Sequence, residues 1–159
     1  MKQLATYLND HLAGSVAAVD LLEHLIKTHE GQPLGQFFEE LRTEVVSDQE
    51  VLKKLLQRFS KESAVRKVVS WIAAKMAEAK LRAGGEKPGE MGLVQALEAL
   101  VLGITGKQLL WRALNATLGA SPLLRGADLG KLEERAIDQL ERVEARRLEA
   151  AHEAFLKDR

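Results

Sequence analysis

The stretch that decides the fold is PLGQFFEELRTEVVSDQEVLKKLLQRF, residues 33–59. Its apolar residues recur at spacings of three and four, the pattern of a helix with one buried side. The positions of this repeat are Leu34, Phe38, Leu41, Val45, Asp48, Leu52, Leu55 and Phe59. Asp48 is the one charged member, and an unpaired carboxylate in a core costs several kcal/mol. We therefore expect Asp48 to have a cation, hydrogen-bond donors or a proton.

The same spacing runs through most of the 159 residues and is interrupted near Pro33, Pro88 and Pro122. Each proline lies close to glycine or serine, which indicates that the prolines separate helices. A chain of this length normally forms one core. The sequence therefore predicts an all-α fold in a single domain, residues 1–159. The predicted helices are residues 2–29, 33–59, 63–82, 92–118 and 126–157.

The lengths of the connections predict how these helices are joined. Residues 30–32 leave room only for a tight turn, so the first two helices should form an antiparallel hairpin. Residues 119–125 should turn the fourth helix back onto the fifth in the same way. The helix at 63–82 would be about 30 Å long, enough to cross most of a bundle. Its apolar side is formed by Val65, Val68, Val69, Ile72, Met76 and Ala79.

Polar side chains interrupt the apolar repeats of the other helices as well. Ser15 holds such a position in the first helix, with His11 one turn earlier, and Gln108 does so in the fourth. In the fifth helix Arg147 stands where an apolar residue is expected, beside Glu144. Counted from each turn, and with two antiparallel hairpins joined by a crossover, Ser15, Asp48, Gln108 and Glu144 fall within about one or two helical turns of one level, and Arg147 lies slightly higher. The predicted buried polar layer is His11, Ser15, Glu44, Asp48, Gln108, Glu144 and Arg147.

Composition narrows the classes of function. Lys plus Arg and Asp plus Glu both total 23, so no net charge favours nucleic acid or an anionic membrane as a partner. The sequence has no cysteine, which excludes disulfides and thiolate chemistry. The first residues lack the pattern of a signal peptide, and we expect no apolar stretch to approach the roughly 18 residues of a membrane span. We therefore expect a soluble, cytoplasmic protein.

Two helical hairpins joined by a long crossover helix, with polar groups at mid-height, resemble the ferritin-like superfamily. The resemblance covers nearly the whole chain. It rests on helix lengths, connectivity and the polar layer. It implies a four-helix bundle. In members with a di-iron site it also implies a Glu from each of two helices and a Glu-x-x-His motif from each of the other two.

That ligand motif is degenerate in this sequence. Three residues after Glu44 comes Ser47, and three after Glu144 comes Arg147. The literal match, Glu149 with His152, falls on the side of its helix opposite the apolar repeat. We therefore predict no metal ligand and no cofactor.

Arg147 suggests how the acids of the polar layer could be compensated without a metal. A guanidinium from the chain itself would supply the charge that iron brings to the acids of a di-iron site. Buried charges of this kind sometimes fix the register of helices at a cost in stability. The hypothesis is a cluster of Arg147 with Glu44, Asp48 and Glu144.

Three classes of function stay open on the sequence. The favoured class is a non-enzymatic interaction or structural protein, forming a homodimer and having no catalytic residue. The second is a small-molecule binder with a cavity near His11, Lys107 and Gln108, although Trp111 is expected to belong to the core and not to such a cavity. The third is a metal-dependent oxidoreductase or iron-handling protein. It requires convergence of His11, Glu44, Asp48 and Glu144 on one ion.

Overall fold

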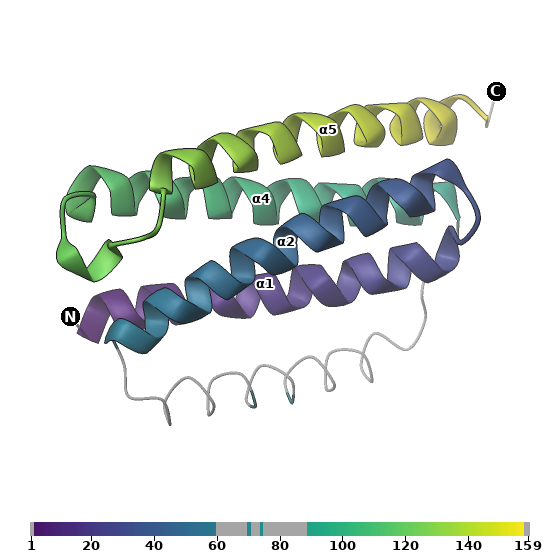
Figure 1. Cartoon of the computed structure of the whole chain (residues 1–159). Helices are drawn as coiled ribbons and strands as arrows, with labels where there is room; N and C mark the ends of the chain where they lie inside the picture. Colours follow the sequence, from purple (N-terminus) through teal and green to yellow (C-terminus); the bar gives the residue numbers. More distant parts are fainter. Residues whose placement is uncertain (1, 60–69, 71–73, 75–88, 158–159) are drawn as a thin grey trace. The chain divides into compact units, whose positions relative to one another are not determined.

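The computed structural model describes residues 2–59, 70, 74 and 89–157. The helices in these ranges are α1 (Lys2–Thr28), α2 (Pro33–Phe59), α4 (Glu90–Leu118), the short 3-10 helix η1 (Pro122–Leu124) and α5 (Leu129–Leu156) (Figure 1). The predicted all-α fold is confirmed. Most of the predicted helix at 63–82 lies outside the described residues, so the ferritin-like crossover stays a prediction.

The described helices belong to two units, and each unit contains one antiparallel hairpin (Figure 1). In the first unit α1 and α2 pack along each other, and residues 120–127 belong to the same unit. In the second unit α4 packs along α5. Both predicted hairpins are therefore confirmed.

Two glycines make the turn between α1 and α2 tight. Gly31 has φ +75°, a backbone conformation that side chains disfavour. Gly35, in the first turn of α2, is buried, and a Cβ there would lie 2.2 Å from the carbonyl oxygen of His29. Pro33 opens α2 at the predicted residue, where its missing N–H leaves no hydrogen bond unmade. The α1–α2 turn thus depends on the absence of a side chain at position 35.

The beginning of α5 differs from the prediction by three residues. Gly126 has φ +86° and so does not continue a helix. Asp128 caps the helix instead, because its carboxylate accepts a hydrogen bond from the backbone N–H of Lys131 at 3.0 Å. The helix therefore starts at Leu129, directly after its cap.

The end of α2 contacts η1 within the first unit. The guanidinium of Arg58 donates Nη1–H to the carbonyl oxygens of Leu123 at 3.0 Å and Arg125 at 2.8 Å. Arg58 thus satisfies two loop carbonyls.

The apolar repeat predicted for α2 is buried along most of its length. Its buried members are Phe38, Leu41, Val45, Asp48, Leu52 and Leu55. In α4 Leu114 is buried, whereas its neighbour Asn115 is exposed. Trp111 is 1% exposed and is a core residue, as predicted.

Among the described helices, α4 is long and apolar enough to cross a membrane by length and composition. The expectation that no stretch approaches a membrane span therefore does not hold for α4 by this criterion. Core helices of soluble proteins meet the same criterion, but they are mostly buried. Only 28% of the apolar window of α4 is buried, so much of its apolar surface needs another explanation.

Candidate functional site

The structure divides the seven residues of the predicted polar layer between the two units. His11, Ser15, Glu44 and Asp48 belong to the first unit, and Gln108, Glu144 and Arg147 belong to the second. Asp48 is buried, whereas the other six are partly exposed. That all seven meet at one level stays a prediction, because they lie on two separately described units.

In the first unit a hydrogen-bonded chain joins α1 to α2 at mid-hairpin. The side-chain amide of Gln49 donates to Ser15 Oγ at 3.0 Å, and Ser15 Oγ–H donates to the carbonyl oxygen of Leu12 at 2.7 Å. Gln49 is buried next to Asp48 in the sequence, and sequence reasoning missed it. Ser15 therefore has a structural role, since its hydroxyl both accepts and donates within the hairpin.

His11 lies near the same part of α1. Its ring makes an edge-on contact with the ring of Tyr7, with centroids 4.7 Å apart. Burial lowers the pKa of His11 below its ordinary value, and the charge of Asp10 opposes this shift. The neutral imidazole is therefore favoured at neutral pH, which fits a packed side chain.

In the second unit the fully buried polar residue of α5 is Gln139, not Arg147. Gln139 is 0% exposed, and its side-chain oxygen accepts a hydrogen bond from the ammonium of Lys107 on α4. Spacings of three and four that lead from Ala136 to Val143 can pass through either Gln139 or Leu140. The structure places Leu140 at partial exposure.

Arg147 connects acids of its own hairpin. It donates Nε–H and Nη2–H to the two carboxylate oxygens of Glu144 at 2.6 and 2.7 Å, and Nη1–H to Glu98 on α4 at 3.4 Å. The hydrogen bond from Arg147 lowers the pKa of Glu144 below its ordinary value. The side chain of Arg147 is 23% exposed, so this part of the predicted cluster lies at the edge of the hairpin and not deep in a core.

Arg147 is one step of a ladder of polar contacts between α4 and α5. The ladder consists of Glu90 with Lys157, Glu98 with Arg147, Lys107 with Gln139, and Arg112 with Glu133. On α4 the two acids come before the two cations, and on α5 Glu133 likewise comes before Arg147 and Lys157. This shared order favours the antiparallel register, because a parallel arrangement would place like charges together.

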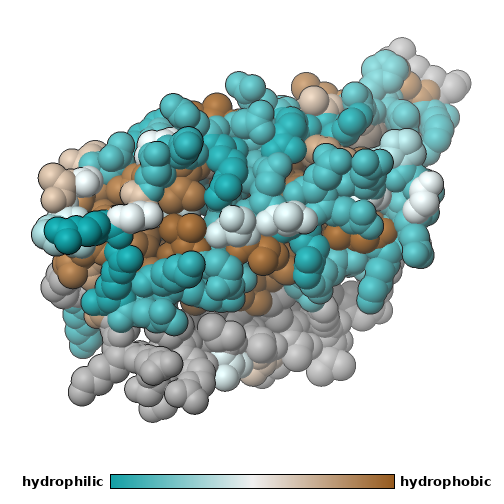
Figure 2. Space-filling model, viewed as in Figure 1, coloured by the Kyte–Doolittle hydropathy of each residue, from teal (hydrophilic) through white to brown (hydrophobic). Residues whose placement is uncertain are grey.

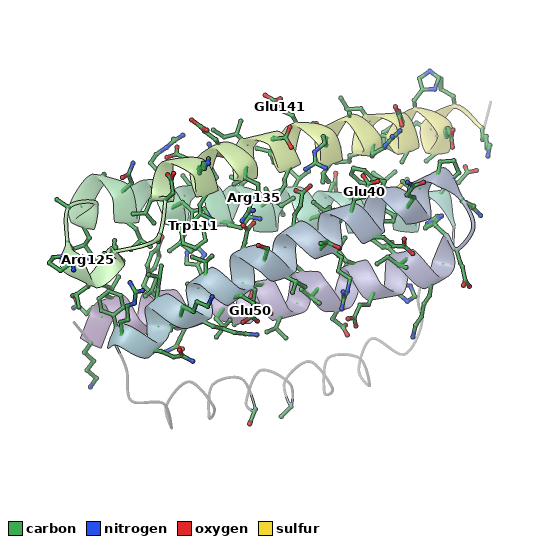
Figure 3. The ribbon with its side chains drawn as sticks, viewed as in Figure 1. Glu40, Glu50, Trp111, Arg125, Arg135 and Glu141 are labelled. Atoms are coloured by element: carbon green, nitrogen blue, oxygen red, sulfur yellow. The ribbon has the colours of Figure 1, made fainter. Side chains whose placement is uncertain are left out.

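Trp111, which Figure 3 labels on α4, has a buried indole N–H with no acceptor among the described residues. A buried N–H without a partner costs about 1–3 kcal/mol. The unpaired indole N–H is therefore the best candidate in the second unit for a position that binds a small polar group.

Within the described ranges, no group of three or more histidine or acidic side chains is arranged to hold a metal ion. Glu149 and His152, the literal Glu-x-x-His match, are both exposed on α5. Their position agrees with the prediction that they face away from the apolar side of the helix.

The outward side of α4 is a second candidate site, and the sequence interpretation overlooked it. Its residues recur at spacings of three and four, as a coiled-coil seam does. We call this surface the α4 outward face, and it consists of Ala99, Leu102, Gly106, Leu109, Ala113 and Ala116. All are exposed except Gly106, which is partly exposed. Leu102 and Leu109, at 74% and 53% exposed, are its large members.

The α4 outward face lies opposite the buried side of its helix. At 100° per residue its six residues share a strip about 100° wide, centred roughly 180° from the buried Leu97, Ile104 and Trp111. Glu98, five turns before Ala116, lies at one edge of the strip, which contains no other charged residue. A helix that is apolar on both sides is normally covered on both sides.

On α5 the outward side has the ordinary character of a surface. Figure 2 shows mostly hydrophilic side chains over this helix, and Glu141 points outward from it in Figure 3. Ion pairs within the helix join Arg142 to Asp138 at 2.8 Å and Arg146 to Glu149 at 2.9 Å. α5 also exposes Leu148, Phe155 and Leu156, but they stand among charged residues, so the continuous apolar repeat on the outward side belongs to α4.

A signal for the α4 outward face was present in the sequence. Residues 92–118 contain two interleaved repeats with the same spacing, and tracing a single repeat leaves the second unassigned.

Comparisons of the chain with protein-family models, with curated proteins and with solved structures found no match.

Proposed function

We propose that this protein is a non-enzymatic helical interaction protein whose binding surface is the α4 outward face. The observation that carries the proposal is the exposure of Leu102 and Leu109 in a repeat that continues over five turns of helix. Exposed apolar surface that is contiguous and rimmed by polar residues is typical of interaction sites. A buried catalytic centre would not require such a surface.

The proposal retains the ferritin-like arrangement of two hairpins joined by a crossover, with a degenerate metal site. Two antiparallel hairpins and a long connection between them support it. The acids of the second hairpin support it too, since Arg147 engages both oxygens of Glu144 and also reaches Glu98. A carboxylate held by a guanidinium in this way is a poor candidate for a metal ligand.

Iron loading tests the absence of a di-iron centre. The full chain would be incubated aerobically with Fe(II), separated from free iron and analysed for metal per chain. The proposal predicts far less than one iron per chain. A value near two, together with oxidation of Fe(II) faster than in buffer, would contradict it and favour the iron-handling alternative.

A small-molecule binder is the second candidate, and the unpaired indole N–H of Trp111 is the observation that favours it. An acceptor on a bound molecule would satisfy that N–H. The Trp71→Phe variant leaves Trp111 as the sole indole. Native mass spectrometry of this variant, before and after unfolding and refolding, would reveal a retained compound. Its loss should change the emission of Trp111 if this candidate is correct.

A further inference from the structure

We infer that the α4 outward face binds the same face of a second copy of this chain, with the two α4 helices antiparallel. The inference rests on the proposed interaction function and names its partner. It follows from two features of α4, the alternation of large and small residues and the charges on one flank, and from the charged surface of α5.

Large and small residues alternate on the face so that it complements itself. One column contains Ala99, Gly106 and Ala113, and the other contains Leu102 and Leu109. In an antiparallel pair, positions of the first column lie opposite positions of the second. The register that places Leu102 of one copy over Gly106 of the other also places Leu109 over Ala99. Each leucine then meets a small residue, which allows close packing without a clash.

The charges beside the face favour the same register. Glu98 and Arg112 lie on the same flank, two heptads apart, with Thr105 midway between them. In a two-fold antiparallel pair this flank meets its own copy, so Glu98 of one chain approaches Arg112 of the other. Both side chains have room to do so, being 53% and 56% exposed. A parallel pair would instead place this flank against Gly103 and Thr117, which offer no charge.

The surface of α5 argues for a protein partner and against a lipid one. α5 lies along α4 through the whole ladder from Glu90 to Arg112. Its exposed charged residues include Glu134, Asp138, Glu141, Arg146 and Glu149. A bilayer that surrounded α4 would also have to accommodate these charges, at a cost of about 2.5–3.5 kcal/mol each near the centre. A second copy covers α4 and leaves α5 in water.

The mass of the full chain in solution tests the pairing. Light scattering after gel filtration should give twice the chain mass of 17.6 kDa. Leu102→Lys and Leu109→Lys should each weaken the dimer by roughly 10- to 100-fold, because each removes a buried leucine from the interface. Leu148→Lys is the matched control. Leu148 is 55% exposed on α5, close to the 53% of Leu109, and its replacement should leave the dimer intact.

Cysteine cross-linking tests the orientation, since the native chain has no cysteine. In the proposed register the double variant Ala99→Cys/Leu109→Cys should form a disulfide-linked dimer under mild oxidation, and each single variant should not. Efficient cross-linking of Ala99→Cys alone would show a parallel pair and overturn the inferred orientation.

Three results would overturn the inference. The first is a monomer at every concentration studied, and the second is an equal loss of dimer in the Leu148→Lys control. The third is binding of the monomer to vesicles of anionic phospholipid that is abolished by Leu109→Lys, which would make lipid the occupant. None of these results depends on the iron content, so failure of the inference is distinguishable from failure of the non-enzymatic proposal.

Discussion

α4 and α5 form one hairpin and have nearly equal lengths, 29 and 28 residues, yet they differ in how they use their two sides. α5 buries one side and exposes another on which Leu148, Phe155 and Leu156 stand among charged residues. α4 buries one side and exposes a second apolar repeat, the α4 outward face. We therefore expect α5 to have a structural role within the hairpin, and we expect α4 to bind a partner through its outward face.

The largest effect should separate the two sides of α4 itself. Leu100 is 2% exposed and Leu102 is 74% exposed, although they are only two residues apart. Leu100→Ala should lower the free energy of unfolding by about 2–5 kcal/mol, because it leaves a cavity in the core. Leu102→Ala should change it by less than about 0.5 kcal/mol in the dissociated chain. Denaturant unfolding at high dilution measures both.

Similar losses in the two variants would remove the distinction between a folding side and a binding side of α4. At high protein concentration we expect a different result. There Leu102→Ala should also lower the apparent stability, since assembly stabilises the folded chain by mass action.

The ladder between α4 and α5 offers a second way to sharpen the comparison. Gln139→Ala should cost about 1–3 kcal/mol, because it removes a fully buried acceptor of the Lys107 ammonium. Glu133→Ala, at the Arg112 step of the same ladder, should cost less than about 1 kcal/mol, since the side chain of Arg112 is 56% exposed. Thermal or denaturant unfolding of the two variants, compared with the parent chain, gives both values. A larger loss for Glu133→Ala would show that the exposed steps hold the register.

The smallest effect concerns pH and the charged edge of α5. Arg147 lowers the pKa of Glu144 in the folded chain below the ordinary value of 4.5. The unfolded chain therefore binds the proton more readily. The stabilisation is present above pH 4.5 and is lost as the pH falls through the lowered pKa. Glu144→Gln should flatten this part of the curve of unfolding free energy against pH, with Glu141→Gln as the exposed control. An unchanged curve would contradict the Glu144–Arg147 interaction.

Much of the fold could be predicted from periodicity and turn chemistry. α2 begins and ends at the predicted residues because Pro33 marks its start and its apolar repeat is continuous. The start of α5 was misplaced because Gly126 was included in the helix, whereas Asp128 provides the cap. Helix boundaries depend on backbone conformation and side-chain caps, which a repeat of three and four does not encode.

The candidate site was harder to predict, for physical reasons that differ between the two hairpins. In the first hairpin, Asp48 and Ser15 were identified from the sequence. Gln49 was missed because it follows Asp48, a member of the apolar repeat, and its own burial depends on packing. In the second, Gln139 was missed, although it is fully buried, because spacings of three and four from Ala136 to Val143 can equally pass through Leu140. The α4 outward face was missed because one helix carries two repeats and only the more regular one was traced.

The most direct measurement compares the thiol reactivity of two variants, Ala113→Cys on the α4 outward face and Ala145→Cys on α5. Both alanines are exposed in the single chain. A difference in thiol reactivity between the two variants should therefore arise only where a partner covers one of the two positions. At high protein concentration we expect the cysteine at position 113 to react with a thiol reagent at least about tenfold more slowly than the cysteine at position 145, and we expect dilution or Leu102→Lys to remove the difference. Equal rates at every concentration would contradict the claim that α4 is covered by a partner.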